Sequence, residues 1–123
     1  MIYDTDILVW TLRGNEKAAA VIDADPQRHA SIVSHMELIQ GARNKRELAA
    51  IRRFMTAFQV LPLSEEIGFR ARIYMEQHSI GNSLGLADAL IAATAIEIQS
   101  QLCTANIRHY RVIPDLELKS FRP

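Results

Sequence analysis

Residues 1–10 read MIYDTDILVW, an apolar stretch that carries two carboxylates, Asp4 and Asp6, at a spacing of two. The surrounding apolar residues predict a buried β-strand over Ile2–Leu8, and the period of two in a strand would point both carboxylates to one side. Asp is uncommon inside strands, and a buried ionised carboxylate is unstable unless something neutralises it. We therefore expect a cationic partner near this strand.

Length and composition predict a single compact domain over residues 1–123, because 49% of the residues are hydrophobic and no Pro, Gly or Ser tract suggests a linker. The one cysteine, Cys103, excludes an intramolecular disulfide and a cysteine-rich zinc site, and fits a buried thiol in a reducing compartment. No run approaches the roughly 18 apolar residues that cross a bilayer, and no signal peptide is evident. We expect a soluble, cytoplasmic protein without membrane contact.

The rest of the chain alternates strand and helix patterns. Further strands are predicted at residues 30–33, 60–63, 102–104 and 112–113, and helices at 15–24, 34–41, 45–58, 64–77 and 86–99. Ser34 is predicted to begin its helix because its spacing to Glu37 matches a capping box, Ser-x-x-Glu. Residues 81–85 are expected to form a loop and residues 105–111 a polar turn. This alternation predicts a mostly parallel sheet covered by helices on both faces.

Three acids lie at or near the carboxyl ends of predicted strands, where open parallel sheets bind ligands: Asp4, Glu37 and Asp88. Each also has a structural explanation. Asp4 fits a hydrogen-bonded core carboxylate, Glu37 a capping box, and Asp88 a favourable interaction with a helix dipole. Asp88, however, continues an apolar stripe of its helix, which the dipole does not explain.

Together the three acids indicate a metal site, because carboxylates at one sheet edge repel each other unless a cation joins them. With no cysteine pair, the oxygen donors favour Mg²⁺ or Mn²⁺ over zinc. Such an ion points to phosphoryl chemistry with a metal-activated water. The motifs of a serine nucleophile, G-x-S-x-G, and of a P-loop are absent. Asp6 fits a turn former or a partner of a metal ligand, and His109 fits either a phosphate contact or a surface residue.

Four short motifs occur in order along the chain. They are D-T-D-I-L at 4–8, S-x-x-E-x-x-x-G at 34–41, A-D-A-L-I-A-A-T-A at 87–95, and T-x-N at 104–106 followed by Tyr110 in an aromatic position. In this order and spacing the chain resembles the PIN-domain ribonucleases, and within them the VapC toxins of bacterial toxin–antitoxin pairs.

The resemblance implies a PIN-like α/β/α sandwich with a short central, mostly parallel sheet, and an endoribonuclease that depends on Mg²⁺ or Mn²⁺ and leaves a 5′ phosphate. Asp4, Glu37 and Asp88 match the three core acids. Asp4 and Asp88 would bind the metal, and Glu37 would bind through water or act as general base. Asp6 stands where the family often has Ser or Asn. Asn106 and His109 stand where it frequently has a fourth acid, and the Asn106 amide can orient a water or an acid.

The resemblance also implies partners: an RNA substrate, a second copy of the chain, and a small VapB-like antitoxin. The antitoxin's C-terminal segment would enter the site, and its N-terminal part would bind operator DNA. A basic span, Arg43–Arg53, fits either RNA steering or a solvated helix face. The apolar side chains beside it fit either the core or a groove for the antitoxin: Ile51, Phe54, Met55 and Phe58.

Three other functions compete with a ribonuclease. A PIN-like module with a weakened metal site would bind RNA or protein with little catalysis, and the missing fourth acid favours it. A phosphoacceptor receiver domain is disfavoured, because the third predicted strand ends in Pro62 and Leu63 and the only late lysine is Lys119. A DNA nuclease stays open, because phosphate contacts alone do not identify the sugar.

Overall fold

The computed structural model describes all 123 residues. A five-stranded parallel sheet with the order β3-β2-β1-β4-β5 lies at its centre, as the alternating pattern predicts. Every strand is only two or three residues long: β1 Ile2–Tyr3, β2 His29–Ser31, β3 Gln59–Leu61, β4 Leu102–Thr104 and β5 Leu118–Ser120. Because all strand pairs are parallel, the loops and helix starts at their carboxyl ends lie at one edge of the sheet.

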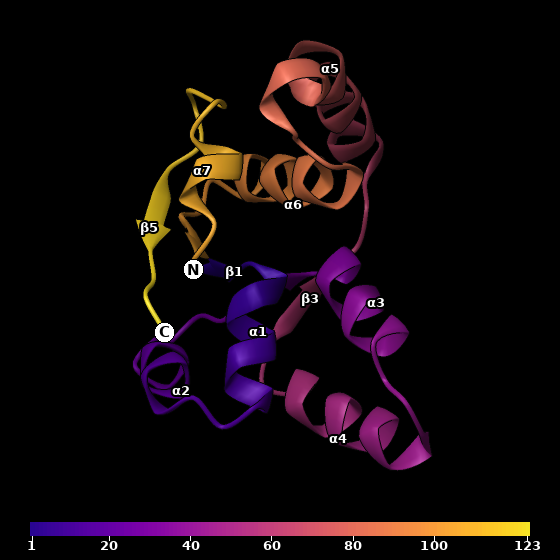
Figure 1. Cartoon of the computed structure of the whole chain (residues 1–123), viewed down its shortest axis with the longest axis vertical. Helices are drawn as coiled ribbons and strands as arrows, with labels where there is room; N and C mark the ends of the chain where they lie inside the picture. The colour runs from indigo at the N-terminus through magenta and orange to yellow at the C-terminus, as the bar shows by residue number, and fades with distance from the viewer.

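Helices cover both faces of the sheet, so the expected three-layer α/β/α sandwich is confirmed (Figure 1). One face is covered by α5, α6 and α7 and the other by α1, α2 and α4, while α3 contacts both α1 and α6. The helices are α1 Thr5–Leu12, α2 Glu16–Asp23, α3 Ile32–Gln40, α4 Lys45–Met55, α5 Glu65–Asn82, α6 Leu86–Glu97 and α7 Ile107–Tyr110.

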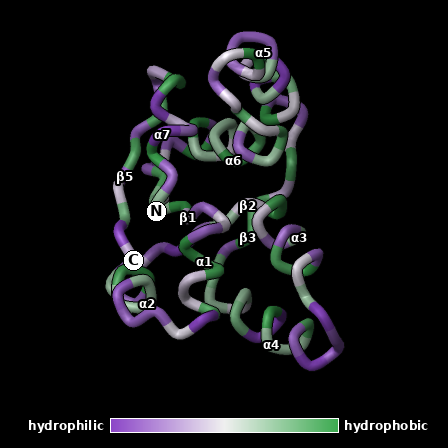
Figure 2. Tube along the Cα trace, in the orientation of Figure 1, coloured by the Kyte–Doolittle hydropathy of each residue, from purple (hydrophilic) through white to green (hydrophobic).

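The alternation of side chains along β1 and β4 divides the core into two clusters. Ile2 and Leu102 pack toward α5 and α6, whereas Tyr3 and Cys103 pack toward α1, α2 and α4. The central strand β1 therefore contributes side chains to both core clusters, and Asp4, the residue that follows β1, lies between β2 and β4. Outside the core, hydrophilic residues concentrate in the turn between α3 and α4 (Figure 2).

The first predicted strand is wrong beyond Tyr3, because Thr5–Leu12 form helix α1. Asp4 has an extended backbone and its side chain accepts a hydrogen bond from the backbone N–H of Thr5, so it caps the helix. The run Ile7–Trp10 is apolar on every side, and such a run fits a buried helix as well as a buried strand. Asp4 and Asp6 consequently lie on a helix start, not on one side of a strand.

Other boundaries also differ from the prediction. Ser31, not Ser34, caps α3, and its hydroxyl accepts from the backbone N–H of Val33. The predicted strand at 112–113 is wrong, since the fifth strand is Leu118–Ser120, and the polar turn contains α7. The expected loop at 81–85 partly falls within α5, which runs to residue 82 with a kink at Ile80 and Gly81.

Several local predictions are confirmed. Asn15 and Ser64 cap α2 and α5, and α6 is apolar and largely buried. Ile51, Met55 and Phe58 belong to the core. The Cys103 thiol is free and buried, and burial raises its pKa to about 11. No helix combines the length and the apolar character needed to span a bilayer.

The aromatic packing beneath the sheet gives a test of the core. Phe58 is 8% exposed and meets the rings of Tyr3 and Phe54 edge-on, with centroids 6.0 Å and 5.2 Å away. Phe58→Ala should lower the free energy of unfolding, measured by urea denaturation, by about 3–4 kcal/mol because it leaves a cavity. Phe69, which is 57% exposed, provides the matched control. Phe69→Ala should cost less than about 0.5 kcal/mol, and equal losses would contradict this assignment of the core.

Candidate functional site

Asp4 is a buried carboxylate at the carboxyl end of the central strand, with 5% of its surface exposed. Its Oδ1 accepts from the Thr5 backbone N–H at 2.8 Å and from the Tyr110 hydroxyl at 3.0 Å. Its Oδ2 accepts from the Thr104 hydroxyl at 2.7 Å. Despite these donors, burial and the neighbouring charge of Asp6 raise the pKa of Asp4 to about 7. The site therefore favours a bound positive charge or a proton at this position.

Asp88 lies in the first turn of α6, facing Asp4 across the Tyr110 hydroxyl. Its Oδ1 is 3.2 Å from that hydroxyl, and its Oδ2 is 3.4 Å from the His109 Nδ1. The Gly85 backbone N–H also donates to Oδ2 at 3.4 Å. The carboxylate is thus bound to the start of its own helix and to α7, and its side chain retains 25% exposure.

Glu37 reaches the same edge from the middle of α3. Its Oε1 accepts from the Thr5 hydroxyl at 2.7 Å, and that hydroxyl also lies 2.9 Å from the Ser34 Oγ. Ser34 therefore contacts Thr5 and does not have the capping role predicted for it. Because Thr5 donates its backbone N–H to Asp4 and its hydroxyl to Glu37, it connects these two acids directly.

A continuous hydrogen-bond network therefore joins the three predicted acids, through Thr5 on one side and Tyr110 on the other. The acids come from the starts of α1 and α6 and from α3, and they meet at the carboxyl ends of the strands, as expected. Sequence reasoning did not identify Thr5 as part of this network. The sequence identifies Tyr110 only as an aromatic residue, and neither the motif around Thr5 nor the motif around Tyr110 indicates a role for the side-chain hydroxyl.

Asp6 lies on the same side of α1 as the network, not in a turn. Its Oδ2 accepts from the Ala105 backbone N–H at 3.0 Å and lies 3.5 Å from the Thr104 hydroxyl. Its Oδ1 is buried and has no hydrogen-bond partner. Burial raises the pKa of Asp6, and the charge of Asp88 adds to this effect. Asp6 therefore adds a further carboxyl group to this edge, and its charged form is disfavoured unless a cation is nearby.

The other residues considered for a fourth ligand are less involved. Asn106 is exposed, and only its backbone N–H contributes, donating to the Thr104 hydroxyl at 2.9 Å. His109 contacts Asp88 through its imidazole and is partly exposed. The T-x-N segment consequently acts on the site mainly through Thr104, whose hydroxyl donates to Asp4.

The donor set fits a hard divalent cation. The atoms that could coordinate a metal here are carboxylate and hydroxyl oxygens. One of them, the Asp6 Oδ1, is buried without a hydrogen-bond partner, and a cation or a water bound to it can satisfy this oxygen. No group of three or more His, Cys, Asp or Glu side chains lies close enough to enclose a metal ion. Mg²⁺ is usually held by one or two carboxylates and several waters, so a Mg²⁺ or Mn²⁺ site does not require three such side chains.

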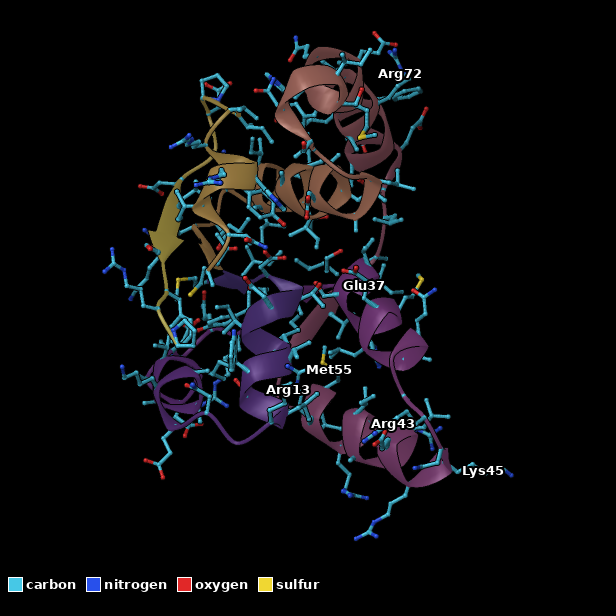
Figure 3. The ribbon with its side chains drawn as sticks, in the orientation of Figure 1. Arg13, Glu37, Arg43, Lys45, Met55 and Arg72 are labelled. Atoms are coloured by element: carbon cyan, nitrogen blue, oxygen red, sulfur yellow. The ribbon has the colours of Figure 1, made fainter.

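A cavity of about 640 Å³ opens between α1, α3 and α4. Glu37 lines it, and so do Arg13 at the end of α1 and Arg43 before α4 (Figure 3). Arg43 forms an ion pair with Glu47, another lining residue, at 3.0 Å. A molecule in this cavity would lie next to Glu37 and hence next to the acidic network.

The chain is similar to known proteins in sequence and in fold over nearly its whole length. A family model described as PIN domain matches residues 1–113. Ribonuclease VapC19 of Mycobacterium tuberculosis is 38% identical over 125 residues, which cover 94% of this chain and 96% of that protein. A toxin–antitoxin complex from Klebsiella pneumoniae superposes with a TM-score of 0.80 at 28% identity, covering 94% of this chain and 93% of that chain. VapBC-1 from nontypeable Haemophilus influenzae gives a TM-score of 0.80 at 26% identity, covering 98% of each chain.

The raised pKa of Asp4 predicts a pH dependence of stability in metal-free protein. Between its ordinary value of 3.8 and about 7, the folded state binds more protons than the unfolded state, so stability falls as the pH rises. From about pH 5 to about pH 8, the unfolding free energy in EDTA should fall by about 2–3 kcal/mol. Asp4→Asn should remove most of this decline, because asparagine still caps a helix but does not ionise.

Urea denaturation at the two pH values measures this effect. Asp115→Asn provides the control, since Asp115 is an exposed acid outside the network and its variant should keep the wild-type decline. If Asp4→Asn loses as much stability as the wild type over this pH range, the decline does not originate at Asp4.

Proposed function

The chain belongs to the PIN-domain family, and from this membership and its acidic network we propose that it is a metal-dependent endoribonuclease toxin neutralised by a cognate antitoxin. The observation that carries the proposal is the network that joins Asp4, Glu37 and Asp88 at the carboxyl ends of the strands. We also propose that residues 1–123 form one domain and that it hydrolyses RNA phosphodiester bonds in the cytoplasm.

In this mechanism Asp4 and Asp88 would hold Mg²⁺ or Mn²⁺. A bound ion would make a nearby water more acidic and would stabilise the negative charge that develops on the phosphate. Glu37 would accept a proton from the attacking water, directly or through a second water. The Thr5 hydroxyl donates a hydrogen bond to the Glu37 Oε1 and so orients the Glu37 carboxylate. Water attacks phosphorus, the bond between phosphorus and the 3′ oxygen breaks, and the leaving 3′ oxygen takes up a proton from solvent, so the products carry a 5′ phosphate and a 3′ hydroxyl.

The proposed partner is a VapB-like antitoxin, because similar chains occur in toxin–antitoxin complexes. Its C-terminal segment would occupy the cavity between α1, α3 and α4, next to Glu37, and block access to the acids. Its N-terminal part would bind operator DNA, so this chain would reach DNA only through the antitoxin. We further propose that the toxin is a homodimer, as the family resemblance implies.

A second candidate function is a binding module with a weakened metal site and little catalysis. Two observations favour it: Asn106 is exposed where a fourth acid is expected, and no three-ligand group surrounds a metal position. Isothermal titration with Mn²⁺ discriminates between the two functions. A nuclease should bind the ion and lose that binding in Asp88→Ala, whereas a metal-free module should release no heat of binding.

Replacing the proposed metal ligands should abolish hydrolysis of RNA. Asp4→Asn and Asp88→Asn should each lower the cleavage rate of single-stranded RNA about 100-fold or more, because each removes a charged ligand without changing the shape of the site. EDTA should inhibit the wild type, and added Mg²⁺ or Mn²⁺ should restore cleavage. Mapping of the cut ends should detect 5′ phosphates.

Asp115→Asn again provides the matched control and should cleave at the wild-type rate. A DNA strand of the same sequence tests the choice of substrate, and cleavage of DNA as fast as RNA would favour the DNA-nuclease alternative. Full activity in Asp4→Asn and Asp88→Asn would show that these carboxylates do not form the active site.

A further inference from the structure

The Tyr110 hydroxyl is the one group that touches both proposed metal ligands. It lies 3.0 Å from the Asp4 Oδ1 and 3.2 Å from the Asp88 Oδ1. Asp4 begins α1 and Asp88 lies in the first turn of α6, whereas Tyr110 ends α7. A phenol carries a single proton and can fully satisfy only one of the two carboxylates at a time.

The position of this hydroxyl is fixed by the ring that carries it. Tyr110 is fully buried and belongs to the hydrophobic cluster that includes Ile2, Ala92 and Ile113. Both oxygens that the hydroxyl touches belong to carboxylates, which accept hydrogen bonds, so the hydroxyl acts as the donor. The hydroxyl is therefore a rigid neutral donor between two acids.

The two carboxylates depend on Tyr110 to different extents. Asp4 Oδ1 also accepts from the Thr5 backbone N–H, and its Oδ2 accepts from Thr104. Asp88 Oδ1 has no other hydrogen-bond donor, and its Oδ2 has only two contacts, both at 3.4 Å. Without the hydroxyl, the orientation of the Asp88 carboxylate would be held only by these long contacts.

We propose that Tyr110 is a positioning residue of the metal site. Its hydroxyl holds one oxygen of Asp4 and one oxygen of Asp88 within hydrogen-bond distance of itself, so that the two carboxylates can share a divalent cation. The inference rests on the proposed function, since it takes Asp4 and Asp88 as the ligands. Donors that orient metal ligands typically contribute about 10–100-fold to metal affinity. The hydroxyl also partly relieves the repulsion between the two carboxylates before the ion arrives.

Tyr110→Phe tests this role because it removes one oxygen and keeps the ring. Titration with Mn²⁺, followed by calorimetry, should show binding about 10-fold weaker than in the wild type. Raising the Mn²⁺ concentration should restore RNA cleavage by this variant, whereas Asp88→Asn should stay inactive. A hydroxyl with a merely structural role would change the Tm but not the affinity for Mn²⁺.

Tyr3→Phe is the matched control. Tyr3 is likewise fully buried and its hydroxyl donates to a carboxylate, the Asp25 Oδ2 at 2.8 Å, but it packs toward α1, α2 and α4, in the other core cluster. Both variants should lower the Tm, and only Tyr110→Phe should weaken Mn²⁺ binding. Equal Mn²⁺ affinities in Tyr110→Phe and the wild type, with binding lost in Asp88→Asn, would overturn this inference alone. Absence of Mn²⁺ binding by the wild type would overturn both this inference and the proposed function.

A second measurement uses the wild type, with Tyr3→Phe as its control. Because the Tyr110 hydroxyl lies within hydrogen-bond distance of both proposed ligands, Mn²⁺ should perturb the near-ultraviolet absorption of Tyr110, and the difference spectrum should saturate together with binding. The same spectrum in Tyr3→Phe assigns the change to a tyrosine other than Tyr3. Saturable Mn²⁺ binding without any tyrosine difference spectrum would contradict the proposed position of the hydroxyl.

Discussion

The burial of one carboxylate at the end of the central strand constrains the rest of this structure. Asp4 has almost no contact with solvent, and its hydrogen-bond donors come from α1, β4 and α7. Each of these elements must therefore end or begin at the same edge of the sheet. Even so, the donors do not offset the loss of hydration, and the pKa of Asp4 stays raised. The fold thus holds a carboxyl group whose ionised form is disfavoured unless a cation lies nearby.

The very short strands explain how the acids come together. Because β1 ends at Tyr3, helix α1 begins at once, and Asp4 can cap it while lying in line with the strand. Thr5, one residue later, then reaches both Asp4 and Glu37. A longer first strand would move this helix start away from α3. The early end of β1 therefore places Asp4 and Thr5 where they meet Glu37 of α3.

The sequence predicted the sheet type and the acids better than the element boundaries. Acidic residues among apolar ones are visible without a structure, and the motifs around Asp4, Glu37 and Asp88 indicated where they would meet. The helical state of Thr5–Leu12 was not predictable, because an apolar run fits strand and helix alike. The role of Tyr110 was not predictable either, since its contact with Asp4 joins residues 106 positions apart. Strand β5, Leu118–Ser120, is mostly exposed and has no apolar pattern to reveal it.

The charges at this edge couple folding to ion binding. Asp4, Asp6 and Asp88 repel one another: Asp6 raises the pKa of Asp4, and Asp88 raises that of Asp6. One oxygen of Asp6 is buried without a donor, which costs stability in the absence of a cation. A cation that binds the folded state alone recovers this loss by mass action. The same electrostatic repulsion that weakens the metal-free fold would therefore add to the affinity of the proposed site for a cation, so substitutions that relieve the repulsion should stabilise the chain and weaken cation binding together.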